Sequence, residues 1–386
     1  MKRKSLKTAL VLWGATDLGP PHFSGDMLWR TGFKAPDPFL LVEIDGKKYV
    51  LVSSLELERA AKESSAEAVN ILEYGLTEEQ ALISFLHHHG VKKIVIPDSF
   101  SYILGAALKK NFKVETTKPP FYPERAIKSA WEIGEIEKAQ SAVERAVIRA
   151  IDFLEICEIR DGRVMRVYDL GGGHVITSEF IRNMIDSELY RAGYLGINTI
   201  VACGAQAASP HCRGSGDLLA YQPIVMDVFP LSMEAHYYAD MTRTIFKGEP
   251  SDALKFMYET VLHAQIGAIE QVRAGEDGYE IYKWVSNFFQ LNLYPTDFTK
   301  RPMEGFFHGV GHGVGIDIHE PPRISSTHDI LKEGMVVTVE PGLYYSQARD
   351  HIPVGGIRIE DMVLVTSDGC HNLTQFPKDL KNMIIP

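Results

Sequence analysis

Three histidines in one glycine-rich stretch are the first residues of this sequence whose types and spacing suggest chemistry. His308, His312 and His319 lie at positions i, i+4 and i+11 between Phe307 and Pro321. Glycine loses the most backbone entropy on ordering, so this stretch is not expected to form a stable helix. We expect an extended or looped segment whose backbone can come close to an ion or a substrate. Taken alone, the stretch fits an ordinary turn with solvated histidines equally well.

Four carboxylates lie in strand-like surroundings elsewhere in the chain. Residues 223–229 and 237–246 are predicted to be strands, and each carries an aspartate. A glutamate ends the apolar run 335–339, and another lies in the predicted strand 356–365. These residues are Asp227, Asp240, Glu340 and Glu360. Side chains alternate along a strand, so Arg358 shares a face with Glu360 and is expected to orient it.

An unpaired carboxylate inside a sheet is costly unless a cation or hydrogen-bond donors accompany it. Salt bridges on solvated strands explain any one of the four, but less readily all four together with the histidines. Oxygen-rich ligands suit Mn²⁺, and a histidine also admits Co²⁺, Fe²⁺ or Zn²⁺. The charges of the four carboxylates would balance two divalent ions, so two metals are favoured over one.

Length and composition describe an ordinary soluble protein. With 386 residues, the chain suggests two domains. Hydrophobic residues make up 45% and charged residues 23%, and the net charge of −10 argues against nucleic acid as a partner. No run is long and apolar enough to predict a membrane helix. The four cysteines are far apart and form no metal or disulfide pattern, which favours a cytoplasmic location.

The elements that would position these residues begin with a small α/β unit. Residues 39–52 are predicted to form a hairpin around Asp45 and Gly46. Thr77 and Gln80 form a capping box that opens a helix, and a strand is expected over 91–96. The proline cluster 118–123 marks the boundary between an N-terminal domain, residues 1–123, and a second domain, residues 124–386. Long helices are expected from about residue 128, near 178, and over 252–273.

The whole set of motifs resembles the M24 metallopeptidases, the group of creatinase, prolidase and methionine aminopeptidase. The shared pattern is D…D-x-T-R-T…H-G-x-x-H-x-x-G-x-x-x-H-[ED]…E-P-G…R-x-E-D, and this sequence keeps each element. The similarity covers nearly the whole chain and is closest to the Xaa-Pro peptidases, aminopeptidase P and prolidase. It implies an α/β creatinase-like N-terminal domain followed by an α+β catalytic domain of the pita-bread fold.

The resemblance also implies a role for each matching residue. Asp227 would bind one metal, His312 and Glu340 the other, and Asp240 and Glu360 would bridge both. A hydroxide between the ions would attack the peptide bond before proline. The catalytic groups would be His319, His211 and Glu340, and the supporting residues His308 and Arg358.

One departure from the family concerns the connection between the two aspartates. Residues 230–236 make this hairpin two residues longer than usual, and Phe229 stands where glycine is common. The longer hairpin puts the substrate in question more than the metals. A hydrolase or lyase acting on a non-peptide substrate, and a non-catalytic binding module of the same fold, remain alternatives, with a methionine aminopeptidase the weakest.

The resemblance further implies a homodimer in which the N-terminal domain of one subunit borders the active site of the other. Residues 26–33 resemble the family's segment near the substrate channel, and Trp29 could anchor that interface. Packing of Trp29 within its own domain explains it equally well. We expect a peptide substrate with proline at its second position and a preference for short peptides.

Overall fold

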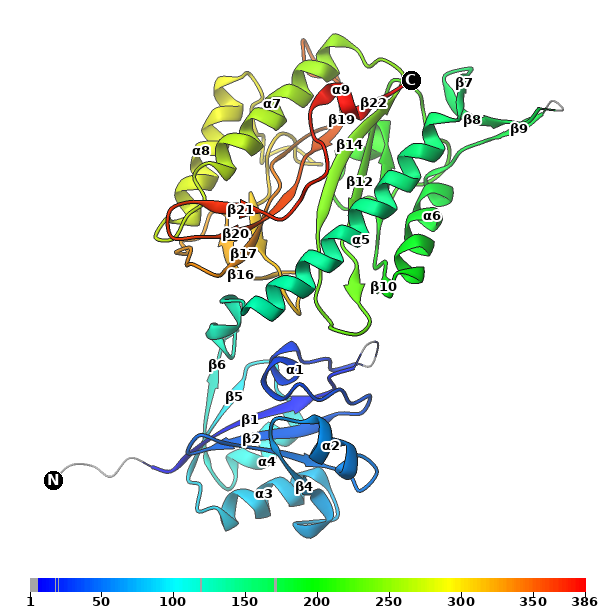
Figure 1. Cartoon of the computed structure of the whole chain (residues 1–386). Helices are drawn as coiled ribbons and strands as arrows, with labels where there is room; N and C mark the ends of the chain where they lie inside the picture. Colours follow the sequence, from blue (N-terminus) through cyan, green and yellow to red (C-terminus); the bar gives the residue numbers. More distant parts are fainter. Residues whose placement is uncertain (1–5, 18, 20, 119, 170–171) are drawn as a thin grey trace. The chain divides into compact units, whose positions relative to one another are not determined.

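The chain divides into two compact units, one up to Arg125 and one from Ala126. The expected boundary lay after Pro123. A computed structural model describes residues 6–17, 19, 21–118, 120–169 and 172–386 (Figure 1). None of the helices in these ranges is long and apolar enough to cross a membrane.

The N-terminal unit is a six-stranded mixed sheet in the order β4-β3-β2-β1-β5-β6, with helices packed on it. Its strands are β1 (Thr8–Gly14), β2 (Phe39–Ile44), β3 (Lys47–Val52), β4 (Glu67–Asn70), β5 (Lys93–Pro97) and β6 (Lys113–Thr117). Its helices are α1 (Gly25–Thr31), α2 (Leu57–Glu63), α3 (Glu78–His88) and α4 (Tyr102–Lys109). The α/β class expected for this unit is confirmed.

Local signals account for two of these elements. Asp45 and Gly46 adopt positive φ of 51° and 80°, as a two-residue turn between β2 and β3 requires. The Thr77 side chain accepts a hydrogen bond from the Gln80 amide at the start of α3. The predicted hairpin and the predicted helix start are both confirmed.

The helices of the C-terminal unit pack as two pairs, α5 against α6 and α7 against α8, around its sheets (Figure 1). They are α5 (Ala130–Glu155), α6 (Ser178–Arg191), α7 (Asp252–Ile269), α8 (Gly278–Leu291) and the short α9 (Leu380–Met383). A capping box of Ser129 and Glu132 opens α5. The helix α8 is not among the predicted helices, although Asp277 caps it and apolar residues recur every four positions: Ile281, Val285 and Phe289.

Two sheets of the C-terminal unit carry most of the candidate site. One has the order β11-β12-β14-β22 and the other β16-β15-β17-β20-β21, while β18 and β19 form a separate pair. The strands are β11 (Ile200–Cys203), β12 (Pro223–Val228), β14 (Met241–Lys247), β22 (Ile384–Ile385), β15 (Gly311–Gly313), β16 (Glu320–Ile324), β17 (Val336–Val339), β18 (Gly342–Tyr345), β19 (Gly355–Arg358), β20 (Asp361–Val365) and β21 (Cys370–Asn372).

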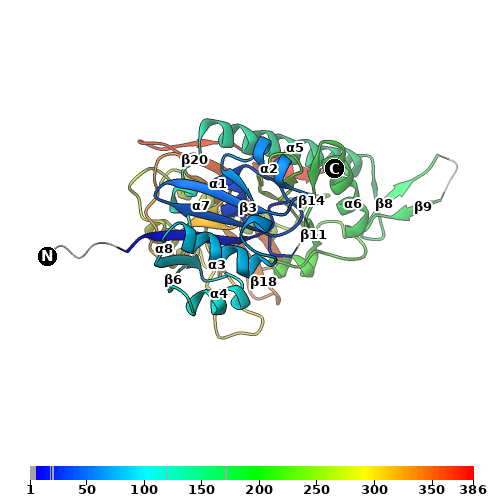
Figure 2. The ribbon, with the colours of Figure 1, turned by 90° about the horizontal axis from the view of Figure 1, so that it is seen from below.

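The remaining strands form smaller sheets. β10 (Tyr194–Leu195) pairs with β13 (Leu231–Ser232), which lies in the connection between β12 and β14. β7 (Glu158–Arg160), β8 (Arg163–Val167) and β9 (Gly173–Val175) form a sheet of their own, which projects from the C-terminal unit in both views (Figures 1 and 2).

Two strand predictions need correction. Residues 356–365 are not one strand, because β19 pairs with β18 whereas β20 pairs with β17. The break falls at Glu360, whose amide donates to the Thr242 carbonyl at 3.1 Å. Likewise, β14 begins at Met241, so Asp240 directly precedes the strand. Both carboxylates thus lie at strand ends, where the backbone is not restricted to regular pairing.

Candidate metal centre

Five strands or strand ends bring the expected ligands together. Asp227 lies in β12, and His312 lies in β15. Asp240 precedes β14, Glu340 directly follows β17, and Glu360 lies between β19 and β20. Asp227, Asp240, His312 and Glu360 are buried, and Glu340 is partly buried. Segments more than 130 residues apart in the sequence therefore converge at one buried position.

The ligand atoms are close enough to share an ion. Asp240, His312 and Glu360 each offer one atom within 4.8 Å of the others. The His312 Nε2 lies 3.7 Å from Asp240 Oδ2 and 3.4 Å from Glu340 Oε1. Asp227 Oδ2 accepts from Arg358 Nη2 at 2.5 Å.

The charges at this position call for a cation. Burial, reinforced by the neighbouring carboxylates, raises the pKa of Asp240 and of Glu360 well above the usual range. Burial also raises the pKa of Glu340 to about 8, with Asp227 adding to the effect and Arg358 opposing it. Within the described residues, Asp240 Oδ1 and Glu360 Oε1 have no hydrogen-bond donor. Such buried unsatisfied oxygens are costly.

His312 cannot supply the missing positive charge. Burial lowers its pKa to about 4, so the ring is neutral at pH 7. Its Nδ1 faces the Gly313 carbonyl at 3.1 Å, so we assign the ring proton to Nδ1. The Nε2 lone pair then points toward the carboxylate oxygens of Asp240 and Glu340. Two electron-rich groups repel each other in this arrangement unless a cation lies between them. Carboxylates with one imidazole form a donor set that suits a divalent metal ion.

A hydrogen-bonded chain beside the centre fixes His308. Arg358 Nη1 donates to the Tyr344 hydroxyl oxygen at 3.0 Å, and that hydroxyl lies 2.9 Å from His308 Nε2. His308 Nδ1 lies 2.7 Å from the Gly309 carbonyl. Burial lowers the pKa of His308 to about 3, so its ring is neutral. With Nδ1 donating, Nε2 accepts from the Tyr344 hydroxyl.

The alternation of side chains along a strand predicted that Arg358 orients Glu360 directly. The structure shows no such contact between the two side chains. The Arg358 guanidinium pairs with Asp227 and donates from Nε to Thr242 Oγ1 at 3.0 Å. Thr242 Oγ1 in turn donates to Glu360 Oε2 at 2.8 Å. The chain leaves the regular strand between Arg358 and Glu360, which places Thr242 between the two side chains.

All the expected site residues line one cavity of about 920 Å³. These are His211, Asp227, Asp240, His308, His312, His319, Glu340, Arg358 and Glu360. The rings of His312 and His319 meet edge to face with centroids 4.4 Å apart, and burial lowers the pKa of His319 to about 4. His211 lies in the exposed loop after the 3₁₀ helix Gly204–Ala208. The rest of the wall is largely apolar and includes Ile197, Phe229, Tyr238, Phe307 and Ile318.

The sequence analysis assigned no role to three residues of this site. Thr242 and Tyr344 lie two and four residues after Asp240 and Glu340, so strand alternation could have indicated both. Arg323 lines the cavity from β16, where it lies opposite His312. No acceptor for its guanidinium is found in the described part of the chain. A register between two strands is not readable from the sequence, so Arg323 had no comparable signal.

Comparisons with known proteins agree with this geometry. Residues 134–367 match metallopeptidase family M24. The Xaa-Pro dipeptidase of Pyrococcus horikoshii is 32% identical over 338 residues, which cover 82% of this chain and 86% of that protein. The X-Pro aminopeptidase structure from Thermotoga maritima has a TM-score of 0.78 at 25% identity and covers 97% of both chains.

The prolidase structure from Pyrococcus horikoshii has a TM-score of 0.76 at 27% identity and covers 97% of this chain and 95% of its own. The similarity to both structures extends over both units, and the pita-bread fold expected for the C-terminal unit is confirmed. Together with the match over residues 134–367, these findings show that the chain belongs to the M24 metallopeptidase family.

Proposed function

We propose that this protein is a metal-dependent peptidase that hydrolyses the Xaa-Pro bond of short peptides. The observation that carries the proposal is the buried carboxylate cluster around a neutral His312, in which two oxygens have no donor within the described residues. Relatives named Xaa-Pro dipeptidase and X-Pro aminopeptidase support the choice of substrate.

The metal ligands that we propose are Asp227, Asp240, His312, Glu340 and Glu360. Four carboxylates balance the charge of two divalent ions, with Mn²⁺ preferred and Co²⁺, Fe²⁺ or Zn²⁺ as the other candidates. Bound ions would supply a nucleophile at neutral pH and positive charge to balance the negative charge that develops on the attacked carbonyl. The resemblance to the family and the chemistry of the donor set support this assignment.

The protein's own side chains would orient the substrate and handle protons. His319 is neutral at pH 7 and can donate an N–H to the developing oxyanion. His211, which lies in a loop that lines the cavity, would contact the peptide. Glu340 would be both a metal ligand and a group that takes up and releases a proton, as the resemblance to the family implies. Arg358 and Tyr344 hold Asp227 and His308 in place.

Arg323 supports a preference for dipeptides. A guanidinium that lines the cavity, with no acceptor among the described residues, can bind a carboxylate. In an Xaa-Pro dipeptide, the free carboxylate lies one residue from the bond that is cut. In a longer peptide, an amide takes its place.

A peptide panel tests the proposal. Metal-free protein is loaded separately with Mn²⁺, Co²⁺ or Zn²⁺ and assayed with Xaa-Pro dipeptides, the same dipeptides amidated at the C-terminus, Xaa-Pro-Xaa peptides and matched Xaa-Ala dipeptides. We expect hydrolysis of the free Xaa-Pro dipeptides and little of the others. A metal-loaded protein inert toward every Xaa-Pro peptide would contradict the proposal. In that case, stoichiometric metal in protein purified without added ions would point to a non-peptide substrate, and no metal in such protein would point to a binding module.

We also propose a homodimer in the cytoplasm. All four cysteines are free, which is consistent with a reducing compartment. Resemblance to the family supports the dimer.

A further inference from the structure

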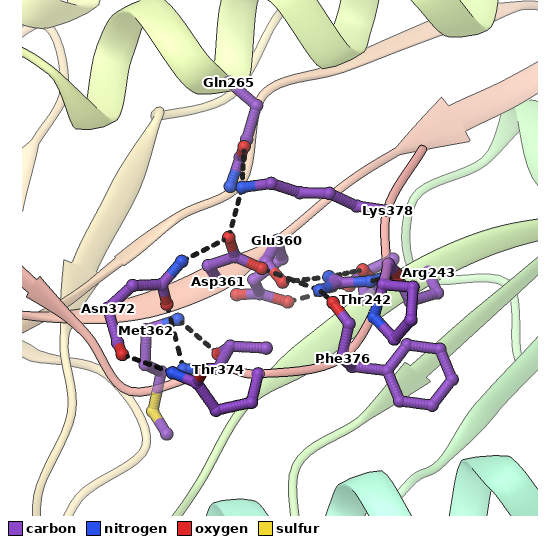
Figure 3. Close-up of polar contacts among 12 residues, drawn as sticks. Thr242, Arg243, Gln265, Glu360, Asp361, Met362, Asn372, Thr374, Phe376 and Lys378 are labelled. Carbon is purple, nitrogen blue, oxygen red and sulfur yellow. Dashed lines mark hydrogen bonds and ion pairs between the residues drawn. The ribbon is translucent and has the colours of Figure 1, made fainter. Parts of the chain in front are cut away.

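A network of buried polar side chains lies next to Glu360 without lining the cavity (Figure 3). At its centre is Arg243, which is fully buried in β14. Arg243 Nη1 donates to the backbone carbonyl of Glu360 at 2.5 Å, and Nη2 donates to Asp361 Oδ1 at 2.8 Å. One guanidinium therefore holds both the backbone of Glu360 and the side chain that follows it.

The same guanidinium is tied to the C-terminal segment. Arg243 also donates to the carbonyls of Phe376 and Pro377, at 2.8 and 2.9 Å. The next residue, Lys378, donates from Nζ to Asp361 Oδ2 at 2.5 Å. Both cations lie within ion-pair distance of the buried Asp361 carboxylate. The three residues thus form one charged unit, Arg243, Asp361 and Lys378.

A second branch of the network leads from Lys378 toward Glu340. Lys378 Nζ donates to Gln265 Oε1 at 2.7 Å, and Gln265 Nε2 lies 3.5 Å from the carbonyl of Val339. Val339 ends β17 and directly precedes Glu340. Lys378 is therefore connected to the backbone next to both glutamates, through Gln265 on one side and through Asp361 and Arg243 on the other.

We infer that Arg243 and Lys378 are positioning residues that set the separation of the Glu340 and Glu360 carboxylates. Both glutamates lie at strand ends, where regular pairing does not fix the backbone, so other contacts must do so. Neither cation lines the cavity, and neither would touch the substrate or an ion. The inference rests on the proposed role of the two glutamates as metal ligands. Partners outside the ligand set commonly change metal affinity about 10–100-fold when they are replaced.

The test compares two lysines of the C-terminal unit, the partly exposed Lys378 and the buried Lys247. Lys378→Met removes the contacts of the ammonium group with Asp361 and Gln265. The control, Lys247→Met, removes a lysine that is 1% exposed and binds the carbonyls of Glu155 and Pro386. Mn²⁺ affinity of the metal-free proteins is measured by calorimetry, with paramagnetic resonance to detect coupling between two ions and thermal unfolding to record stability. We expect Lys378→Met to weaken Mn²⁺ binding about 10–100-fold. Lys247→Met should keep the wild-type affinity, even if its melting temperature falls further.

A conservative variant separates positioning from general stability. Lys378→Arg keeps a cation for Asp361 and should recover most of the Mn²⁺ affinity and the coupling signal. Arg243→Lys keeps the charge but cannot donate to Glu360 and Asp361 in the same way, so it should weaken binding at least as much as Lys378→Met.

Wild-type affinity in Lys378→Met, or equal losses in both lysine variants, would overturn the inference while leaving the proposed function intact. A wild-type protein that binds no divalent ion would overturn both.

Discussion

His312 cannot relieve the repulsion among its carboxylate neighbours. Its low pKa leaves it uncharged at neutral pH, and its Nδ1 is occupied by the Gly313 carbonyl. The carboxyls must therefore keep protons or bind a cation, and their raised pKa values reflect the first of these states. Burial, together with repulsion among the carboxylates, therefore leaves the cluster with protons that a metal ion can replace, as is usual where deprotonated ligands bind an ion.

Metal binding and turnover should separate between two alanine variants. Glu360→Ala removes the proposed bridging ligand, so we expect both ions to bind weakly or not at all. His319→Ala removes only a donor to the substrate, so it should keep both ions and lose roughly 10²–10³ in kcat, the usual scale for one oxyanion donor. Metal content by mass spectrometry and kcat are measured for both variants. A His319→Ala protein without metal, or Glu360→Ala with two ions and normal turnover, would show that the roles are wrong.

Arg323 should decide between dipeptides and longer substrates. Arg323→Gln removes the charge that we expect to meet the dipeptide carboxylate, so kcat/KM for an Xaa-Pro dipeptide should fall mainly through a higher KM. The amidated dipeptide, which has no carboxylate, serves as the control and should lose little. Equal losses for both substrates would mean that Arg323 does not recognise the carboxylate.

At the scale of elements, amphipathic helices and tight turns could be predicted from the sequence, but the ends of the site strands could not. The β2–β3 hairpin and the starts of α3 and α5 follow from local residues such as Gly46, Thr77 and Ser129. The break at Glu360 depends on contacts with β14 that lie over 100 residues away in sequence. The site residues could be named from their motif. The pairing of Arg358 with Asp227 could not be predicted, because it too depends on a contact between residues over 100 positions apart.

The connection between β12 and β14, which is two residues longer than usual in the family, is packed against the rest of the C-terminal unit. Tyr237 is 3% exposed, and its hydroxyl donates to Glu132 Oε1 at 2.7 Å. Tyr238, the next residue, lines the cavity instead. Tyr237 therefore stabilises the fold of this connection, whereas Tyr238 contributes to the cavity wall.

Replacing Tyr237 should lower stability with little effect on activity, whereas replacing Tyr238 should affect activity. Tyr237→Phe removes a buried bond to a carboxylate, so the free energy of unfolding should fall by about 1.5–3 kcal/mol with kcat/KM of the folded enzyme little changed. Tyr238→Ala, at the cavity wall, should raise KM, and Tyr238→Phe should change stability by less than about 0.5 kcal/mol. Denaturant unfolding and steady-state kinetics measure both effects. A Tyr237→Phe protein of wild-type stability would argue against the anchoring role.

At the scale of the molecule, the dimer stays a prediction. Trp29, which we considered as an interface anchor, is only partly exposed and packs against Tyr122 with ring centroids 5.7 Å apart. Packing within its own unit therefore accounts for Trp29, and family resemblance remains as the support. Light scattering should give twice the 43.2 kDa of one chain. A single-chain mass at working concentration would rule the dimer out.

The stability of the metal-free protein should fall as the pH rises from about 6.5 to 8. Glu340, with a pKa of about 8 against 4.5 for a free glutamate, keeps its proton in the folded state over a range where the unfolded chain has lost it. The folded state then binds more protons, so the free energy of unfolding decreases with pH. His308, His312 and His319 have lowered pKa values, so they contribute the opposite slope, which fades above about pH 6.5 as the unfolded chain loses its imidazole protons. The raised pKa values of Asp240 and Glu360 add to the fall.

One carboxyl can contribute at most about 2 kcal/mol over this window, which corresponds to a few degrees of melting temperature. Bound metal replaces the protons, so saturating Mn²⁺ should abolish the fall or reverse it. Thermal unfolding of metal-free and Mn²⁺-loaded protein at several pH values checks the prediction, and Glu340→Gln, which cannot titrate, is the control with a smaller slope. If the metal-free protein instead becomes more stable between pH 6.5 and 8, the carboxyls of the cluster do not hold the protons that we assign to them.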